Sequence, residues 1–266
     1  MVKILAGILT SRETDDIVRA IKSAQHRDVS IVVIVNTNDN ELYESVKTKV
    51  AELKVVDVVK TQSNGNPGKG KNSVISYFKK TDYTHLIPID GDDYLAKDGI
   101  KYLVKYIKIL EPDVVGQGNN KMSIGDLNTT WEDFGQNIVD PKYNWSDLEE
   151  VSKKTILSLV KIRNLSDTIL PFNRFLILSK TAITKFKYCE DIKIADDITA
   201  YLQLYAQTVK GIKYYITKTR ELYVYDLTDQ GVLHQYVSGE HHKDMQTFFD
   251  KVGELNFDGA AVTYID

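Results

Sequence analysis

Three carboxylates crowd into the segment Asp90-Gly91-Asp92-Asp93, directly after the apolar run from Thr84 to Ile89. A run of this kind, bounded by acidic residues and glycine, predicts a buried strand that ends in a tight turn. Open α/β sheets bind their ligands at the carboxyl ends of strands. Carboxylates held this close repel one another unless a cation lies among them, and oxygen ligands suit Mg²⁺ or Mn²⁺. A solvated acidic turn is the plainer interpretation of the same residues.

A second acidic pair, Asp196-Asp197, lies at the start of a segment with helical periodicity that runs to Ala206. Apolar residues in that segment recur on one face at Ile198, Leu202 and Tyr205. Carboxylates at a helix start satisfy free backbone N–H groups, so one of the pair is expected to cap the helix. The other carboxylate is then available for chemistry.

A glycine-containing segment, Gly65 to Ser73, nearly matches the phosphate-binding pattern G-x-x-x-x-G-K-[ST]. Asn72 stands where that pattern needs a hydroxyl for the metal ion, and Pro67 removes one backbone N–H donor. These departures leave a P-loop-type nucleoside triphosphatase or kinase as an alternative. We expect a loop from Gln62 to Gly70 and a helix from Asn72 to Lys79.

The elements that must position these residues alternate along the first half of the chain. Strands followed by helices imply βαβ units, and hence an α/β fold with a mostly parallel central sheet and helices on both faces. The expected strands are 3–10, 30–35, 55–60, 84–89 and 113–116, and the expected helices are 13–24, 41–53, 72–79 and 98–110.

The second half of the chain begins with a polar stretch, 119–160, which contains both tryptophans, Trp131 and Trp145. We interpret it as an insertion lying over the sheet, with a helix at 148–159. Beyond it the pattern predicts strands at 175–178, 213–216 and 222–225 and helices at 181–186 and 197–206. A length of 266 residues suits one large domain, in which the insertion (119–160) separates a first part (1–118) from a last part (161–266).

The composition is that of an ordinary globular protein, with 42% hydrophobic and 27% charged residues. A net charge of −3 gives no general attraction to nucleic acid or to an anionic membrane. No apolar run reaches the length of a membrane span. The single cysteine, Cys189, excludes an internal disulfide and fits a reducing cytoplasm, so we expect a cytoplasmic protein.

The order and spacing of the motifs resemble family 2 glycosyltransferases and their GT-A relatives. The resemblance covers about residues 1–225 apart from the insertion. Two positions depart from the family's usual pattern: the acidic pair reads Asp-Asp instead of Glu-Asp, and the nucleoside turn has only one acidic residue, Asp39. The matching segments are the opening strand with Thr10-Ser11-Arg12, the turn Asn36-Thr37-Asn38-Asp39, the glycine segment ending in Lys71-Asn72, the strand with Asp90-Gly91-Asp92, and Ala195-Asp196-Asp197-Ile198.

This resemblance implies a GT-A (Rossmann-like) fold and a hexosyltransferase-like enzyme. It also implies that residues 1–118 form the nucleotide-binding half of the domain and residues 161–266 the acceptor-binding half. Such an enzyme moves a sugar from a nucleotide-diphosphate donor, with a UDP-sugar favoured, to an acceptor hydroxyl, with inversion and with help from Mn²⁺ or Mg²⁺. The acceptor stays open, and a noncatalytic nucleotide- or glycan-binding protein is a second alternative. The implied roles are a catalytic base at Asp197 with Asp196 as its partner, metal ligands at Asp90, Asp92 and His242, and donor-binding residues at Thr10, Arg12, Asp39, Lys71, Asn72, Asp90 and Gly91.

Overall fold

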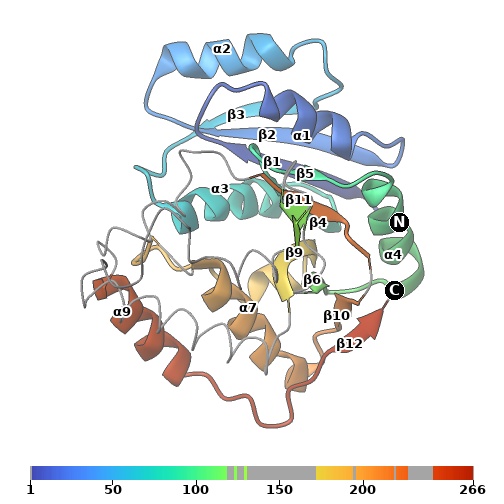
Figure 1. Ribbon diagram of the computed structural model, residues 1–266, viewed down its shortest axis with the longest axis vertical. Coiled ribbons are helices and arrows are strands. Elements are labelled where there is room, and N and C mark those ends of the chain that lie inside the picture. Colours follow the sequence, from blue (N-terminus) through green and yellow to red (C-terminus); the bar gives the residue numbers. More distant parts are fainter. Residues whose placement is uncertain are drawn as a thin grey trace.

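The computed structural model describes residues 2–118, 123–124, 129–130, 172–193, 196–218, 220–226 and 242–265 (Figure 1). Both tryptophans and the helix expected at 148–159 lie outside the described residues, as does nearly all of the insertion.

An eight-stranded sheet forms the centre of the fold, in the order β12-β10-β6-β9-β4-β1-β2-β3. Strand β9 runs antiparallel to both of its neighbours, β4 and β6, and every other pairing in this sheet is parallel. The prediction of a mostly parallel α/β sheet is therefore confirmed. Its strands are β1 (Ile4–Thr10), β2 (Val29–Asn36), β3 (Asp57–Thr61), β4 (His85–Asp90), β6 (Val114–Gly118), β9 (Phe172–Ser179), β10 (Tyr214–Thr217) and β12 (Thr263–Ile265).

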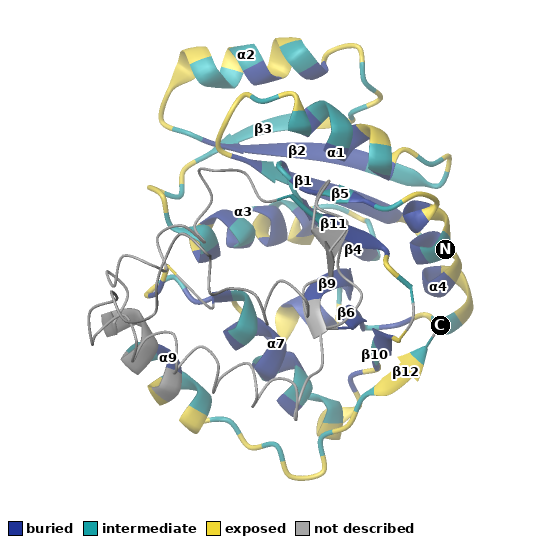
Figure 2. Cartoon of the chain, in the orientation of Figure 1, coloured by how far each residue is buried: buried dark blue, intermediate teal, exposed yellow. Residues whose placement is uncertain are grey.

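Helices cover both faces of this sheet. Alternate residues of one strand enter different cores, as Leu5 does on one face and Ile4 and Ala6 on the other, because successive side chains point to opposite faces. Burial on both faces explains the continuous apolar runs of the parallel strands (Figure 2). Helices α1 (Asp16–Ala24), α2 (Asn40–Val50) and α4 (Gly99–Leu110) pack on one face, and α3 (Pro67–Lys79), α7 (Asp196–Ala206) and α9 (His242–Gly253) on the other.

A smaller sheet lies beside the acidic turn, in the order β5-β11-β7-β8. Its first strand, β5, follows the turn directly and pairs antiparallel with β11 from the second half of the chain. This pairing brings residues 223–226 next to the carboxyl end of β4. The strands are β5 (Tyr94–Leu95), β7 (Ser123–Ile124), β8 (Thr129–Thr130) and β11 (Tyr223–Tyr225).

The predicted elements within the described residues are confirmed in type, with bounds that shift by a few residues, except at two places. Helix α3 begins at Pro67, so the loop expected from Gln62 to Gly70 is wrong from residue 67 onward. The Asn66 side chain caps the helix by accepting a hydrogen bond from the Lys69 N–H (2.8 Å), and Pro67 lies in the first turn, where its missing N–H costs nothing. The helix expected at 181–186 is only a 3₁₀ turn, η4 (Ala182–Thr184).

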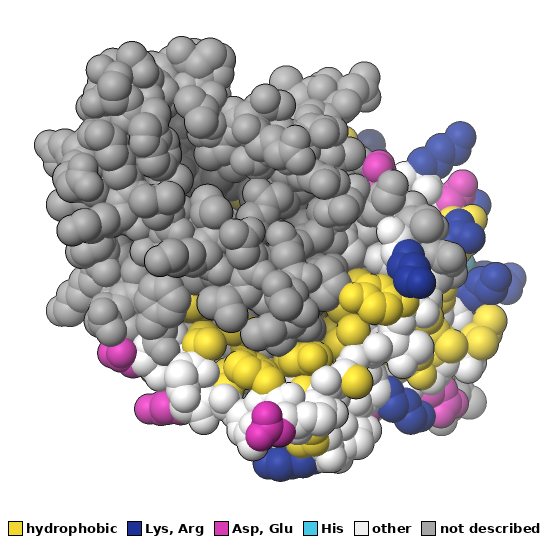
Figure 3. Space-filling model, turned by 60° about the horizontal axis from the view of Figure 1, so that its bottom comes forward, with side chains coloured by type: hydrophobic (Ala, Val, Ile, Leu, Met, Phe, Trp, Pro, Cys, Tyr) yellow, Lys and Arg dark blue, Asp and Glu magenta, His cyan; other side chains and the backbone are white. Residues whose placement is uncertain are grey.

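Within the described residues no helix has the length and apolarity needed to cross a bilayer. Hydrophobic side chains nevertheless reach the surface on the face that comes forward in Figure 3. Two exposed ones belong to the last part of the chain, Val209 in the 3₁₀ turn η5 (Thr208–Lys210) and Tyr264 in β12, which are 49% and 45% exposed.

Candidate active site

The acidic turn lies directly against the end of β1. Asp90 is the last residue of β4, and the next residue, Gly91, donates its N–H to the Leu9 carbonyl oxygen (2.7 Å). A Cβ at position 91 would lie only 2.8 Å from the Thr10 Cβ and 2.9 Å from the Leu9 oxygen. Glycine is therefore needed here for close packing. The Thr10 hydroxyl in turn closes a local turn by accepting the Arg12 N–H (3.2 Å).

Asp93 anchors the acidic turn to the late strand β11. It is 1% exposed and accepts hydrogen bonds from the Tyr223 hydroxyl (2.7 Å) and the Asp226 N–H (2.9 Å). The same Tyr223 oxygen accepts the N–H of Asp90 (3.2 Å). Burial raises the pKa of Asp93 well above its ordinary value, because Arg174, 3.8 Å away, offsets only part of the cost of burying a carboxylate.

Arg174, in β9, is a site residue that the sequence reasoning missed. Its Nη1 lies 2.6 Å from Asp90 Oδ2, and its guanidinium lies 4.6 Å from the centre of the Tyr223 ring. Burial alone would raise the pKa of Asp90, but the charge and hydrogen bond of Arg174 hold it below the ordinary value. One signal was present: an arginine beside the apolar run Phe175 to Leu178 is rarely buried unless it is paired.

Asp92 is the carboxylate of the turn best suited to a cation. Burial and the negative charge of Asp90 raise its pKa, so a second negative charge here is unfavourable until a cation offsets it. The described residues contain no group of three or more His, Cys, Asp or Glu side chains that would enclose a metal ion by themselves. Magnesium that binds with a nucleotide needs only one or two carboxylates, because phosphate oxygens and waters complete its shell. Asp92 and Asp90 fit that arrangement.

The second acidic pair comes close to the glycine segment through an ion pair. Asp196 is 4% exposed, and its Oδ2 lies 3.0 Å from the Nζ of Lys71 in α3. Burial raises the pKa of Asp196 to about 6, because it outweighs the attraction of Lys71 and because Asp197 adds a like charge. Lys71 also lies 5.5 Å from the centre of the Tyr188 ring.

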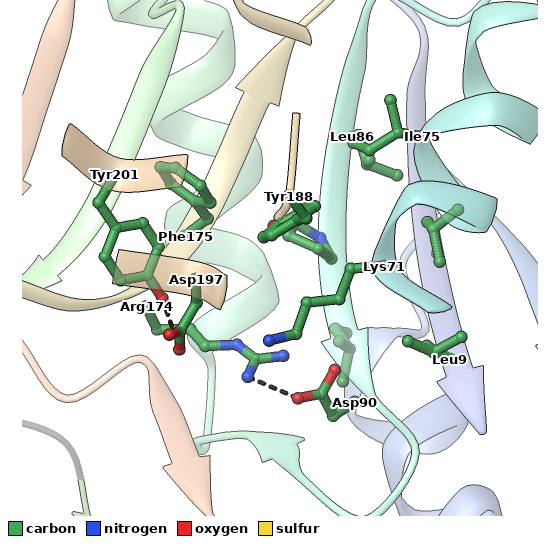
Figure 4. Close-up of a pocket in the computed structure, with 14 residues that line it drawn as sticks. Leu9, Lys71, Ile75, Leu86, Asp90, Arg174, Phe175, Tyr188, Asp197 and Tyr201 are labelled. Atoms are coloured by element: carbon green, nitrogen blue, oxygen red, sulfur yellow. Dashed lines mark hydrogen bonds and ion pairs between the residues drawn. The ribbon is translucent and has the colours of Figure 1, made fainter. Parts of the chain in front are cut away.

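Asp197 faces the same space as Asp90. Figure 4 shows its side chain pointing toward the region where Arg174, Lys71 and Asp90 converge. Its Oδ1 accepts the Ile198 N–H (2.8 Å), and its Oδ2 accepts a long hydrogen bond from the Tyr201 hydroxyl (3.4 Å). A cavity of about 20 Å³ lies between these groups, room for about one water molecule. A ligand larger than a water molecule therefore has to bind outside this cavity.

Four further candidates complete the set that the family resemblance implies. Asp39 caps α2 by accepting the Glu41 N–H (2.7 Å). The charge of exposed Arg12 offsets a small part of the rise in the pKa of Asp92 that burial and Asp90 cause. Asn72 is buried and hydrogen-bonded to residues 188 and 190. His242 is the first residue of α9, and its side chain lies outside the described part of the structure. The predicted Asp90, Asp92, Lys71, Asp196 and Asp197 thus converge on one site.

A family profile for glycosyl transferase family 2 matches residues 7–169, more than half of the chain. The chain belongs to this family. The matched range contains the acidic turn and the glycine segment, and it ends before the Asp196-Asp197 pair. Membership confirms the expected glycosyltransferase at the level of the family, and it disfavours the P-loop alternative. Among proteins of curated function, none matches the chain in sequence.

Solved glycosyltransferase structures share the fold. TarS of S. aureus (residues 1–349) with UDP-GlcNAc gives a TM-score of 0.60 at 16% identity, over 97% of this chain and 69% of that one. The mannosyltransferase PcManGT of Pyrobaculum calidifontis with GDP-Man and Mn²⁺ gives 0.58 at 13% identity, over 96% and 66%. A longer TarS structure gives 0.54 at 16% identity, over 88% of this chain but only 38% of TarS. These similarities confirm the GT-A fold.

Proposed function

We propose that this chain transfers a sugar, with inversion, from a nucleoside-diphosphate donor to an acceptor hydroxyl, with the help of Mn²⁺ or Mg²⁺. One observation carries the proposal: the carboxylates of the site divide into two kinds. Asp90 and Asp196 are each paired with a cation, Arg174 and Lys71, respectively. Among the ion pairs of the described residues, Asp92 and Asp197 have no cationic partner.

The two carboxylates outside these ion pairs, Asp92 and Asp197, suit the two tasks of the reaction, which are to bind the metal ion and to accept a proton. Asp92, with Asp90 beside it, would hold the divalent cation, which supplies charge stabilisation for the departing diphosphate. Asp197 faces the same space from α7 and is only partly buried, so its carboxylate is available to take the proton of the attacking hydroxyl. Attack opposite the leaving group inverts the anomeric centre.

The proposal of a nucleotide donor rests on the positions of three residues and on the ligands of structurally similar enzymes. Thr10 ends β1, Arg12 lies two residues after it, and Asp39 follows β2, at the carboxyl ends of the strands, where ligands bind in such sheets. TarS has been solved with UDP and with UDP-GlcNAc, and PcManGT with GDP-Man. We favour a UDP-sugar for this chain, with a GDP-sugar as the competing outcome.

Thermal shift tests the proposal directly. We expect UDP or GDP to raise the melting temperature strongly only when Mn²⁺ or Mg²⁺ is present, because ligands that bind the native state stabilise it by mass action. Asp92→Asn should remove most of this metal-linked shift without unfolding the protein. Asp82→Asn, the same chemical change in an exposed residue before β4, is the matched control and should leave the shift intact. Equal stabilisation in excess chelator would overturn the metal role.

A further inference from the structure

The segment 187–190 lies between the two halves of the site and is held from both sides. From α7, the Gln203 side chain donates to the Lys187 carbonyl oxygen (3.0 Å) and accepts the Lys187 N–H (3.1 Å). From α3, Asn72 makes the same kind of reciprocal contact with the next residue, Tyr188. The segment therefore connects the helix of Lys71 with the helix of the acidic pair.

Asn72 uses nearly all of its hydrogen-bonding capacity in this contact. Its Nδ2 donates to the Tyr188 carbonyl oxygen (2.9 Å) and to Glu190 Oε1 (2.8 Å). Its Oδ1 accepts the Tyr188 N–H (3.1 Å). Both N–H groups and one acceptor position are thus occupied, and the side chain is only 9% exposed. No donor hydrogen remains for a phosphate or a sugar.

The position of the Tyr188 ring depends on this backbone contact. The ring lines the cavity together with Asp90 and Asp197 and lies 5.5 Å from the Lys71 Nζ. It also makes an edge contact with Phe175, at 6.4 Å between ring centres. Lys71 in turn holds Asp196, beside the proposed base. A shift of the 187–190 segment would move the ring that packs against this ion pair.

We propose that Asn72 is a positioning residue of the enzyme: it locks the 187–190 segment to α3, and thereby sets the place of Tyr188, Lys71 and the Asp196-Asp197 pair. This role replaces the donor contact that the family resemblance implies for Asn72. The catalytic part of the inference rests on the proposed function, whereas the structural part does not.

Two measurements test it. In Asn72→Ala, hydrogen exchange should become faster for residues 187–193 and the start of α7, and stay unchanged in β1 and β2. Turnover, measured as release of nucleoside diphosphate from its sugar donor, should fall by roughly 10²-fold, the scale for misplacing reacting groups by about 1 Å. Binding of the diphosphate with Mn²⁺ should stay within about twofold of wild type, since Asn72 has no N–H left for the donor.

A pair of conservative changes separates positioning from loss of folding. Asn72→Asp keeps an acceptor for the Tyr188 N–H but removes both donors and places a second carboxylate against Glu190. Adding Glu190→Gln to that variant supplies an N–H donor across the same contact, and should restore part of the turnover and of the exchange protection. Asp113→Ala is the matched control. It removes hydrogen bonds from Ser179 (2.6 Å) and Lys213 (3.0 Å) just before β6, at the end of the strands opposite the site. It should change neither the hydrogen exchange of residues 187–193 nor the turnover.

Each result decides one claim. Unchanged exchange at 187–193 in Asn72→Ala would overturn the positioning role, and so would loss of diphosphate binding with normal turnover at saturating donor, which marks a donor contact. If the wild-type protein binds no nucleotide, the proposed function fails. The exchange data still decide whether Asn72 holds the segment.

Discussion

Gly68 gives the sharpest test of how the glycine segment works, because its added side chain meets backbone rather than solvent. A Cβ at this position would lie 2.0 Å from the Cys189 carbonyl oxygen and 2.9 Å from its carbonyl carbon. An ordinary contact begins near 3.4 Å, so α3 and residue 189 would have to separate by about 1.4 Å. The Asn66 contact to the Glu190 carbonyl oxygen (2.7 Å) and the Asn72 contacts would then stretch or break.

The expected cost of Gly68→Ala follows from opposing contributions. Overpacking costs about 1–3 kcal/mol, and each weakened hydrogen bond costs about 1 kcal/mol. Alanine offsets about 1 kcal/mol of this through its higher helix propensity. We expect a net loss of roughly 2 kcal/mol in the free energy of unfolding, which a urea titration measures as a lower midpoint. Turnover should fall by about 10²-fold, as for other displacements of reacting groups by about 1 Å.

Gly253→Ala is the matched control. Gly253 ends α9, has no positive φ, and an added Cβ meets nothing within 4 Å. The control should be neutral or slightly stabilising. If Gly68→Ala were as stable and as active as Gly253→Ala, the close approach of α3 to residue 189 would be irrelevant, and the glycine segment would need another explanation.

Three further predictions concern single side chains of the site. Asp197→Asn should keep metal and diphosphate binding while turnover falls by roughly 10²–10⁴-fold. NMR of the wild-type product should show that the anomeric configuration is inverted. A retained configuration, or near-normal turnover in Asp197→Asn, would show that Asp197 is not the base of an inverting transfer. For Asp196, the folded pKa is raised from 3.8 to about 6, so the native state holds the proton more tightly. The contribution of Asp196 to the free energy of unfolding is therefore full below about pH 4 and is lost as the pH rises through 6, a change of up to about 3 kcal/mol. In Asp196→Asn, the free energy of unfolding measured with urea should depend less on pH across this window. Arg174→Met should cost about 3 kcal/mol, the lower end of the range for breaking a buried ion pair, because Asp90 is only partly buried and keeps the more distant charge of Lys71. Arg174→Lys should recover part of the melting temperature, and an unchanged melting temperature in Arg174→Met would contradict the pairing.

Much of the sheet and half of the site follow from local sequence patterns. Apolar runs on both faces of parallel strands are visible in the sequence, so the alternation of strands and helices was predictable. Asp90 ends a buried strand and Asp196 begins a helix, each within one residue of the boundary that the sequence predicts. Parallel topology then brings the strand ends together at one edge of the sheet.

The other half of the site, which the sequence did not predict, depends on contacts between distant segments. Arg174 reaches Asp90 only because β9 enters the sheet between β4 and β6, an order that no local pattern encodes. In the sequence, Gly68 and Gly70 belong to a glycine-containing segment whose phosphate-loop interpretation was only an alternative. They are required instead where a Cβ would strike the Cys189 carbonyl oxygen and the Asn36 side chain, at 2.0 and 2.6 Å. Close approaches of this kind depend on the tertiary structure, and a single sequence does not predict them.

The balance of charge in the assembled site gives an independent argument for a divalent cation. Within the described residues, four carboxylates besides the buried Asp93, whose pKa is raised by burial, face the positive charges of Lys71, Arg174 and Arg12. A nucleoside-diphosphate sugar would bring further negative charge into this surplus. Repulsion between like charges is strong in a partly desolvated site, so the donor needs a positive partner beyond those that the described residues supply. We therefore expect donor affinity to fall steeply, and not marginally, when the metal is removed. The four carboxylates are Asp90, Asp92, Asp196 and Asp197.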